Sequence, residues 1–98
     1  MTKPKYGRTD ANHAEIIGWF LELGCTVQDT SQVGLGFPDI VVGLVGRTVL
    51  VEIKTADGDL LPSQVTFNAK WRGEAPQLVR TQQDCIELVT RIRRGERR

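Results

Sequence analysis

The sequence predicts an α/β protein in which helices pack around one mixed β-sheet. Apolar residues recur at helical spacing near both ends of the chain, and short runs rich in β-branched residues lie between them. Glycine and proline separate these segments. The resulting order is helix, three strands, helix, strand and helix, which is typical of an α/β sandwich. Because the chain has 98 residues, we expect a single domain over residues 1–98.

The first predicted helix begins at a cap on Thr9 or Asp10, runs to about Leu23 and ends at Gly24. Its apolar residues share one face at helical spacing: Ile16, Ile17, Phe20 and Leu23. Residues 25–28 then predict a short strand, and the glycine-containing segment after them predicts a loop.

The centre of the predicted sheet comes from two runs of β-branched residues, 38–44 and 48–53. Only residues 45–47 lie between the runs, and a link of this length predicts a hairpin. Residues 57–59 then break the strand pattern.

The last third of the chain predicts a helix, a strand and a helix. The helix begins at Pro62 and Ser63 and ends near Gly73, and the strand covers residues 77–80. Thr81 then caps the final helix. The apolar residues of that helix are available for the core: Ile86, Leu88, Val89 and Ile92.

Charge is distributed unevenly, although the formal net charge is only +1. Basic residues gather at both ends of the chain: Lys3, Lys5, Arg8, Arg91, Arg93, Arg94, Arg97 and Arg98. Basic ends around an acidic centre suit a protein that binds phosphates and holds a divalent metal, and the alternative is that the ends are solvated and frayed. We expect residues 1–8 and 93–98 to be flexible basic tails.

No apolar run is long enough to span a membrane, because glycine and arginine interrupt residues 40–51. No apolar signal segment opens the chain. Cys25 and Cys85 have no metal-ligand neighbours at short spacing and are expected to be buried thiols. We therefore expect a soluble cytoplasmic protein with no membrane partner.

Charged residues at the ends of the two central strands indicate a functional site. Asp39 lies at the start of the first strand, and Glu52 and Lys54 flank Ile53 at the end of the second. Alternate residues of a strand face the same side, so Glu52 and Lys54 point together. A hairpin through residues 45–47 places Asp39 across from Glu52. The alternative is an ordinary surface ion pair, because such a pattern also arises by chance.

The chemistry of these groups suits a hard divalent cation. Mg²⁺ takes carboxylate and carbonyl oxygens, and it leaves positions open for water and phosphate. Asp39, Glu52 and the Ile53 carbonyl supply such oxygens. A bound ion acidifies water and polarises a phosphate, and Lys54 orients the attacking water or neutralises the charge that develops. This pattern favours phosphodiester hydrolysis.

The chain resembles the VRR-NUC family of the PD-(D/E)XK nuclease superfamily, especially its short stand-alone members of phage and prophage type. The resemblance covers roughly residues 10–87. It rests on motifs that occur in order and with family-like gaps, at residues 10–16, 33–43, 51–54, 61–64 and 71–73. This chain departs from the family in having Gln64 where relatives often carry Glu, Asn68 where His is frequent, and a short loop after Lys54.

The resemblance implies a restriction-endonuclease-like αβββαβα core and a Mg²⁺- or Mn²⁺-dependent endonuclease. It implies that Glu15 reaches the metal through water and that Gln64 borders the active site. The implied substrate is branched or structured DNA such as a Holliday junction, cut by a homodimer. The alternatives are a nuclease of the same fold acting on flaps, single strands or RNA, and a module that binds nucleic acid without cleaving it.

Residues of the first helix and of the first loop have competing interpretations. Glu15 is either a site residue or a solvated acid like Glu22 on the same flank. His13, the only histidine, is expected to pack or to make a capping contact. Gly34 and Gly36 are not part of a P-loop, because no Lys-Ser/Thr follows, and they are expected to permit a close approach or a bend before the first central strand.

Residues of the second half also leave alternatives open. Phe67 and Trp71 lie four apart and are expected to make core or dimer contacts, with base stacking as the alternative. Arg80 meets either a phosphate or the partner of a surface ion pair.

Overall fold

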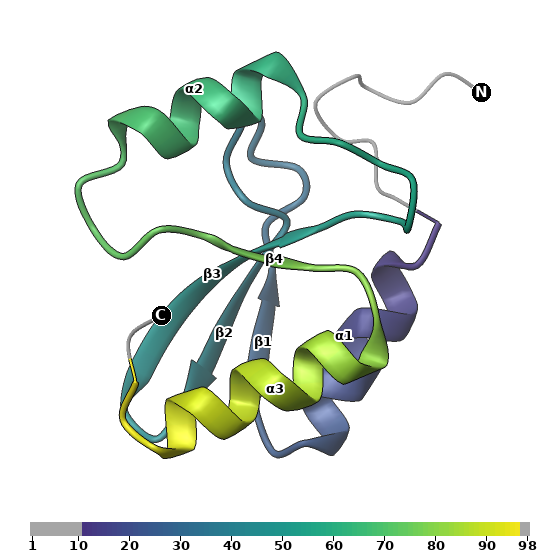
Figure 1. The fold of residues 1–98 in the computed structure, drawn as a ribbon, viewed down its shortest axis with the longest axis vertical. Helices are drawn as coiled ribbons and strands as arrows, with labels where there is room; N and C mark the ends of the chain where they lie inside the picture. Colours follow the sequence, from purple (N-terminus) through teal and green to yellow (C-terminus); the bar gives the residue numbers. More distant parts are fainter. Residues whose placement is uncertain (1–10, 97–98) are drawn as a thin grey trace.

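The order of helices and strands confirms the predicted α/β class (Figure 1). The structure is a computed structural model that describes residues 11–96. Its elements follow in chain order: α1 (His13–Glu22), β1 (Thr26–Asp29), β2 (Ile40–Leu44), β3 (Arg47–Ile53), α2 (Pro62–Lys70), β4 (Gln77–Val79) and α3 (Gln82–Arg93).

The four strands form one mixed sheet in the order β1-β2-β3-β4. β1, β2 and β3 pair antiparallel, and β4 pairs parallel to β3. The predicted hairpin joins β2 to β3 through Val45 and Gly46, whose φ angles are 45° and 79°, as tight hairpin turns require. Its register runs from the Leu44–Arg47 pair to the Ile40–Val51 pair, so Asp39 lies just beyond the last paired residue of β2.

One face of the sheet forms the core. Cross-strand partners put the buried residues of the strands on this face: Ile40, Val42, Val49, Val51, Ile53 and Val79. α1 and α3 contact each other and cover the face with their apolar residues: Ile16, Phe20, Cys85, Leu88, Val89 and Ile92. Burial of these side chains supplies most of the stabilising free energy.

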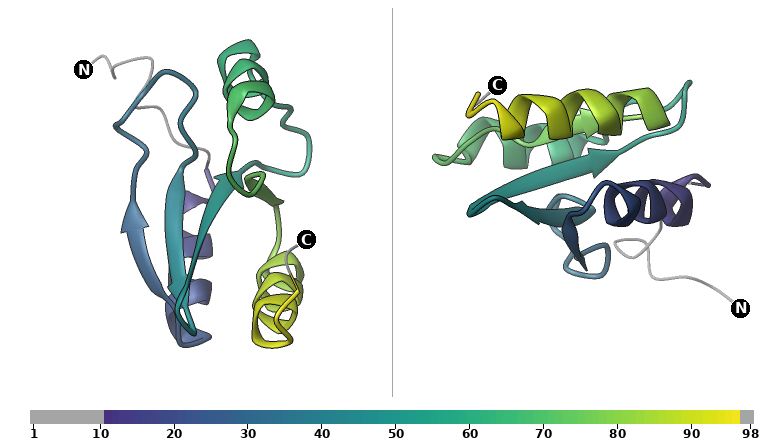
Figure 2. Two further views of the ribbon diagram at one scale, coloured as in Figure 1. Left: turned by 90° about the vertical axis from the view of Figure 1, so that its left-hand side faces the viewer. Right: turned by 90° about the horizontal axis from the view of Figure 1, so that it is seen from below.

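The second face of the sheet departs from the predicted sandwich. Thr26, Gln28 and Thr48 point to this face and are exposed. α2 lies beyond the ends of the central strands, away from α1 and α3 (Figures 1 and 2), and reaches the second face at one end. The expectation of a sheet flanked by helices therefore holds for one face, and the other stays largely open in the described part of the chain.

Both α1 and α3 end in a glycine-containing Schellman turn. At the end of α1, the N–H groups of Gly24 and Cys25 donate to the carbonyls of Leu21 and Phe20. Gly24 has a φ of 92°, which confirms it as the predicted stop.

The corresponding turn after α3 changes the predicted C-terminal tail. Gly95 and Glu96 donate to the carbonyls of Ile92 and Arg91, and Arg93 is still helical. Residues 93–96 are therefore part of the helix and its cap. The predicted tail over residues 1–8 and the last two residues of the chain lie outside the described residues.

Two helix boundaries also differ from the prediction. Asn12 occupies the N-cap position of α1 without a capping hydrogen bond from its side chain, and the predicted caps Thr9 and Asp10 lie outside the described residues. α2 ends at Lys70 rather than near Gly73, because Trp71 has an extended backbone with a ψ of 125°. The predicted cap at Thr81 is confirmed, since its side chain accepts a hydrogen bond from the Asp84 N–H.

Both cysteines are buried and unpaired, as predicted. Burial, helped by the negative charge of Asp84 and by that of Cys25 once it ionises, raises the pKa of the Cys85 thiol to about 12. Such a thiol is unreactive near neutral pH. In the described part of the chain, the helices are too short or too polar to cross a membrane.

His13 ties α1 to β1 and packs as predicted. Its side chain is buried, and its Nε2–H donates to Asp29 Oδ2 at 3.2 Å. Partial burial alone would raise the pKa of the Asp29 carboxyl, but hydrogen bonds from Ser31 and His13 outweigh it and lower the pKa.

Asp29→Asn is expected to reduce stability at neutral pH and to lose this effect in acid. A carboxylate with a lowered pKa stabilises the fold above its unfolded pKa of about 3.9, and this contribution disappears as pH falls through the folded value. The loss should stay below about 1 kcal/mol, because Asp29 is 52% exposed and solvent screens it. Urea unfolding at pH 7 and pH 3 measures the effect, with the exposed loop variant Asp59→Asn as control. An equal loss for Asp29→Asn at both pH values would contradict it.

Candidate metal centre

The structure brings Asp39 and Glu52 together at the end of the central hairpin. The Asp39 N–H donates to the Val51 carbonyl at 3.0 Å, so Asp39 and Ile40 both lie against Val51, as in a β-bulge. The Asp39 side chain turns toward β3, where its Oδ2 accepts the Ile53 N–H at 2.7 Å. The carboxylate of Asp39 is thus held beside the backbone of the residue that follows Glu52.

Glu52 and Lys54 lie on the second face, as their spacing predicts, while Ile53 points into the core. Both charged residues are nevertheless buried, with 1% of Glu52 and 6% of Lys54 exposed. Removing charges from water costs several kcal/mol per ion unless partners compensate. This cost is large compared with the total stability of a small protein. The buried Glu52 and Lys54 therefore differ from an ordinary ion pair on the surface.

Gln64 covers Glu52 from α2. Its Oε1 accepts the Leu61 N–H at 2.7 Å, and its Nε2 donates to Glu52 Oε1 at 2.9 Å. The backbone bond fixes which end of the amide faces Glu52, because only the NH₂ end can donate to a carboxylate. Gln64, the buried residue of α2, therefore lies in the cluster rather than only at its edge.

The loop before Asp39 places the first turn of α2. Gly36 has a φ of 80°, and a Cβ at this position would lie 2.1 Å from the Ser63 carbonyl oxygen. The loop is closed at its base by Thr30, whose N–H and Oγ1 donate to the carbonyls of Asp39 and Pro38 at 2.9 and 2.8 Å. Gly36 thus permits the predicted close approach, and the segment it approaches is the turn that carries Gln64.

Asn12 holds the backbone behind Lys54, a role that was not predicted. Its Nδ2 donates to the carbonyls of Lys54 and Arg80, each at 3.1 Å. One amide group therefore joins the ends of the neighbouring strands β3 and β4. The position of Asn12 at the start of a helix indicates a cap, and nothing in the sequence indicates this long-range contact.

Arg80 makes contacts with backbone carbonyls in place of the predicted surface ion pair, and its contact with a phosphate stays a prediction. Its Nη1 donates to the Thr55 and Gly58 carbonyls at 2.6 and 2.7 Å. The guanidinium thereby holds the loop that follows Lys54. Together with Asn12, it fixes the backbone on both sides of this lysine.

Glu15 does not join the two carboxylates in the described structure. It is exposed in the first turn of α1, and residues 11–96 hold no group of three or more His, Cys, Asp or Glu side chains arranged around a common ion. A contact of Glu15 through water stays a prediction. Glu22 is likewise exposed, at the other end of the same helix.

The donor set of Asp39 and Glu52 fits a hard divalent cation. Two carboxylates and a neighbouring main-chain carbonyl are the oxygen ligands that Mg²⁺ and Mn²⁺ prefer. Asp39 has a second carboxylate oxygen, Oδ1, as a possible ligand besides the Oδ2 that accepts the Ile53 N–H. The residues present therefore agree with the predicted metal, although the third acid is missing from the cluster.

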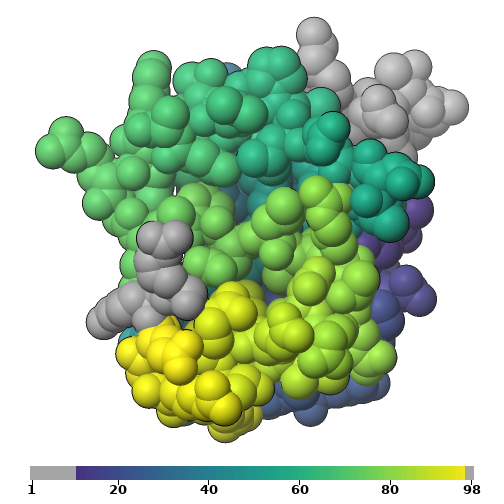
Figure 3. Space-filling view, viewed as in Figure 1, coloured from purple at the N-terminus to yellow at the C-terminus, as the bar shows by residue number. Residues whose placement is uncertain are grey.

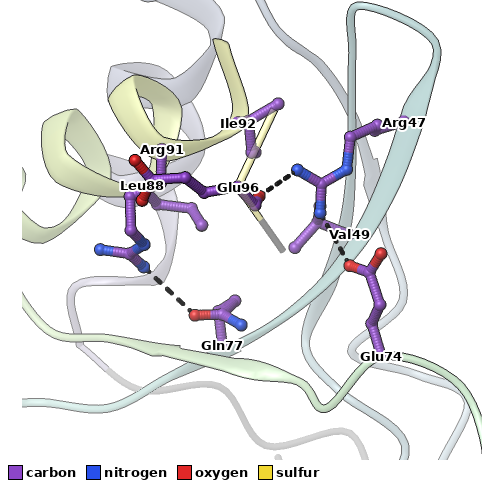
Figure 4. Close-up of a pocket in the computed structure, with 8 residues that line it drawn as sticks. All are labelled: Arg47, Val49, Glu74, Gln77, Leu88, Arg91, Ile92 and Glu96. Carbon is purple, nitrogen blue, oxygen red and sulfur yellow. Dashed lines mark hydrogen bonds and ion pairs between the residues drawn. The ribbon is translucent and has the colours of Figure 1, made fainter. Parts of the chain in front are cut away.

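A small pocket lies away from these carboxylates, between the start of β3 and the end of α3 (Figure 4). Its volume is about 10 Å³, enough for roughly one water molecule. Arg47 pairs with Glu74 at 2.9 Å, and Arg91 donates to Gln77 at 3.2 Å. The Arg91 contact attaches the end of α3 to β4, and the Arg47 pair joins β3 to the segment before β4. The pocket is too small for a substrate.

No protein-family model matches the chain, and no curated protein matches it.

Proposed function

We propose that this chain is a metal-dependent nuclease that hydrolyses phosphodiester bonds in DNA. The observation that carries the proposal is the Asp39 carboxylate held by the Ile53 N–H beside the buried Glu52, with Lys54 buried just beyond the end of β3. The order αβββαβα and the motifs of the sequence support a restriction-endonuclease-like core of the PD-(D/E)XK type. The same motifs support membership of the VRR-NUC family.

In this proposal Asp39, Glu52 and the Ile53 carbonyl hold Mg²⁺ or Mn²⁺. When bound, the ion supplies an acidified water molecule and a Lewis acid for the phosphate. Hydrolysis forms one phosphorus–oxygen bond to water and breaks the bond to the leaving oxygen, which takes a proton. The Lys54 ammonium lies on the same face and neutralises charge that develops on the phosphate oxygens.

The surrounding contacts keep these groups in place before substrate arrives. Gln64 orients the Glu52 carboxylate, and the Asp39 carboxylate is held by the Ile53 N–H. Asn12 and Arg80 hold the backbone that presents Lys54. Catalysis by fixed charges depends on such preorganisation, because little energy is then spent on rearrangement during the reaction.

The proposed substrate is branched or structured DNA, cut by a homodimer in the cytoplasm. A domain of this size offers little surface for reading bases, so recognition of the backbone and of DNA shape is favoured. A two-fold dimer would place two sites on opposing strands, as junction cleavage requires.

The proposal is tested by cleavage assays on labelled four-way junction, flap, duplex and single-stranded DNA and on RNA, with Mg²⁺, Mn²⁺ or EDTA. Wild type is expected to cut DNA only with metal, and Glu52→Gln or Asp39→Asn should reduce the rate at least about 100-fold. Glu15→Gln and Glu22→Gln form a matched pair, in which only the first should slow cleavage. Binding without cleavage under every metal condition would instead indicate a non-cleaving module.

A further inference from the structure

An aromatic row leads from the carboxylates to the surface. Phe37 comes two residues before Asp39, and its ring lies edge-on to Phe67 with centroids 5.4 Å apart. Phe67 in turn stacks on Trp71, with centroids 5.0 Å apart and planes 20° from parallel. Phe67 follows Gln64 by three residues on α2, so the row begins beside the cluster and runs along this helix.

Trp71, at the outer end of the row, is packed against neighbouring residues but stays accessible to solvent. Trp71 is 43% exposed, although Phe67 lies against its indole ring. Gly73 approaches the other end of the indole, since a Cβ there would lie 2.8 Å from Nε1. Lys70 and Arg72, on either side of Trp71 in the chain, are both exposed. This end of α2, in green, projects at the edge of the molecule in Figure 3.

We propose that Trp71 stacks on an unpaired base of a DNA strand, while Lys70 and Arg72 contact the adjoining phosphates. The inference rests on the proposed nuclease function, because it concerns the strand that enters at Asp39 and Glu52. An indole ring accepts the face of any base, and cations beside it follow the sugar–phosphate backbone. Bases inside a duplex have both faces covered by their neighbours. The site therefore selects DNA with an unpaired nucleotide near the bond that is cut.

Charge favours nucleic acid over a second copy of the chain at this position. In a two-fold interface centred on Trp71, Lys70 and Arg72 would face their own copies, and like charges repel. A polyanion meets the same two cations favourably and releases its counterions.

Fluorescence tests the inference without requiring cleavage. A Trp19→Phe background leaves Trp71 as the only tryptophan, and EDTA prevents metal-dependent cutting. Single-stranded oligothymidylate is expected to quench Trp71 emission. An oligonucleotide of the same length made of abasic residues keeps every phosphate, and it should bind about tenfold more weakly without quenching. A blunt duplex should quench less than the single strand.

Variants separate the ring from its charges. In the wild-type background, Trp71→Ala should weaken binding of oligothymidylate about tenfold, and Trp71→Phe should restore part of it. The double variant Lys70→Ala/Arg72→Ala should instead weaken the salt dependence of binding to both oligonucleotides.

Three results would overturn the inference: equal quenching by the abasic strand, unchanged affinity in Trp71→Ala, or a dimer that Trp71→Ala converts to monomers in sedimentation. If wild type cuts DNA but the base contributes nothing, only the stacking site is lost. If stacking is seen but no DNA is cut with any metal, the nuclease proposal fails and the base-binding site stands.

Discussion

Lys54→Met is expected to reduce the turnover of DNA cleavage at least about 100-fold while the protein stays folded and binds metal. The ammonium group is the proposed source of positive charge at the reacting phosphate, and loss of one such group costs this much in other enzymes. Methionine keeps the apolar stem that fills the buried position, where Lys54 is 6% exposed. The change therefore removes the charge with little loss of packing.

Stability and metal binding provide the controls for this variant. Removing the ammonium ends its own cost of burial but also takes a positive charge away from the buried Glu52, so Lys54→Met should stay folded and unfold at a lower urea concentration than wild type. Calorimetric titration with Mn²⁺ should show binding at least as tight, since a positive charge has been removed beside the carboxylates. Asp39→Asn should give the opposite pattern, with weaker Mn²⁺ binding. Wild-type turnover in Lys54→Met would contradict the role given to this lysine.

The approach of Asp39 to the end of β3 could be predicted because it depends on the hairpin, which is a local feature. Two runs of β-branched residues and a link of three residues predict a hairpin, and a hairpin fixes the register of its strands. Val45 and Gly46 then adopt the positive φ angles of a tight turn. The direction of Glu52 and Lys54 follows from the two-residue period of a strand.

The contacts around this pair could not be predicted in the same way. Asn12 reaches the carbonyl of Lys54 across 42 positions, and Gln64 reaches Glu52 from a different element. Periodicity indicates which face a residue occupies, but it does not indicate which distant group that residue meets. The family resemblance pointed to Gln64. Asn12 and Arg80 were not predicted as site residues, because an asparagine before a helix usually caps it and an exposed arginine usually forms a surface contact.

The open second face of the sheet could not be predicted either, because it too depends on contacts between distant residues. Val41 and Leu50 alternate with core residues and are partly buried, so the sequence of β2 and β3 is apolar on both faces. Such strands predict helices on both sides of the sheet. The place of α2 depends instead on contacts between distant residues, among them the close approach of Gly36 to Ser63, which no pattern of hydrophobic residues reveals.

Gly36→Ala is therefore expected to damage both the fold and the site. A Cβ would lie 2.1 Å from the Ser63 oxygen and 2.6 Å from its carbonyl carbon, and these are backbone atoms that cannot rotate away. α2 must shift, and the Gln64 amide then leaves Glu52. We expect a loss of about 1–3 kcal/mol for the forced displacement, in addition to about 1 kcal/mol for alanine at a positive φ.

Gly46→Ala is the matched control that isolates the displacement. Gly46 has a φ of 79°, close to the 80° of Gly36, but a Cβ there meets nothing within 4 Å. Gly46→Ala should lose only the free energy of about 1 kcal/mol that alanine costs at a positive φ, and it should retain cleavage. Gly36→Ala should lose more stability and cut DNA far more slowly. Urea unfolding and DNA cleavage measure the two effects on the same samples. Equal losses of stability in the two variants would show that α2 tolerates the added methyl group, and the contact of Gly36 with Ser63 would then not determine where Gln64 lies.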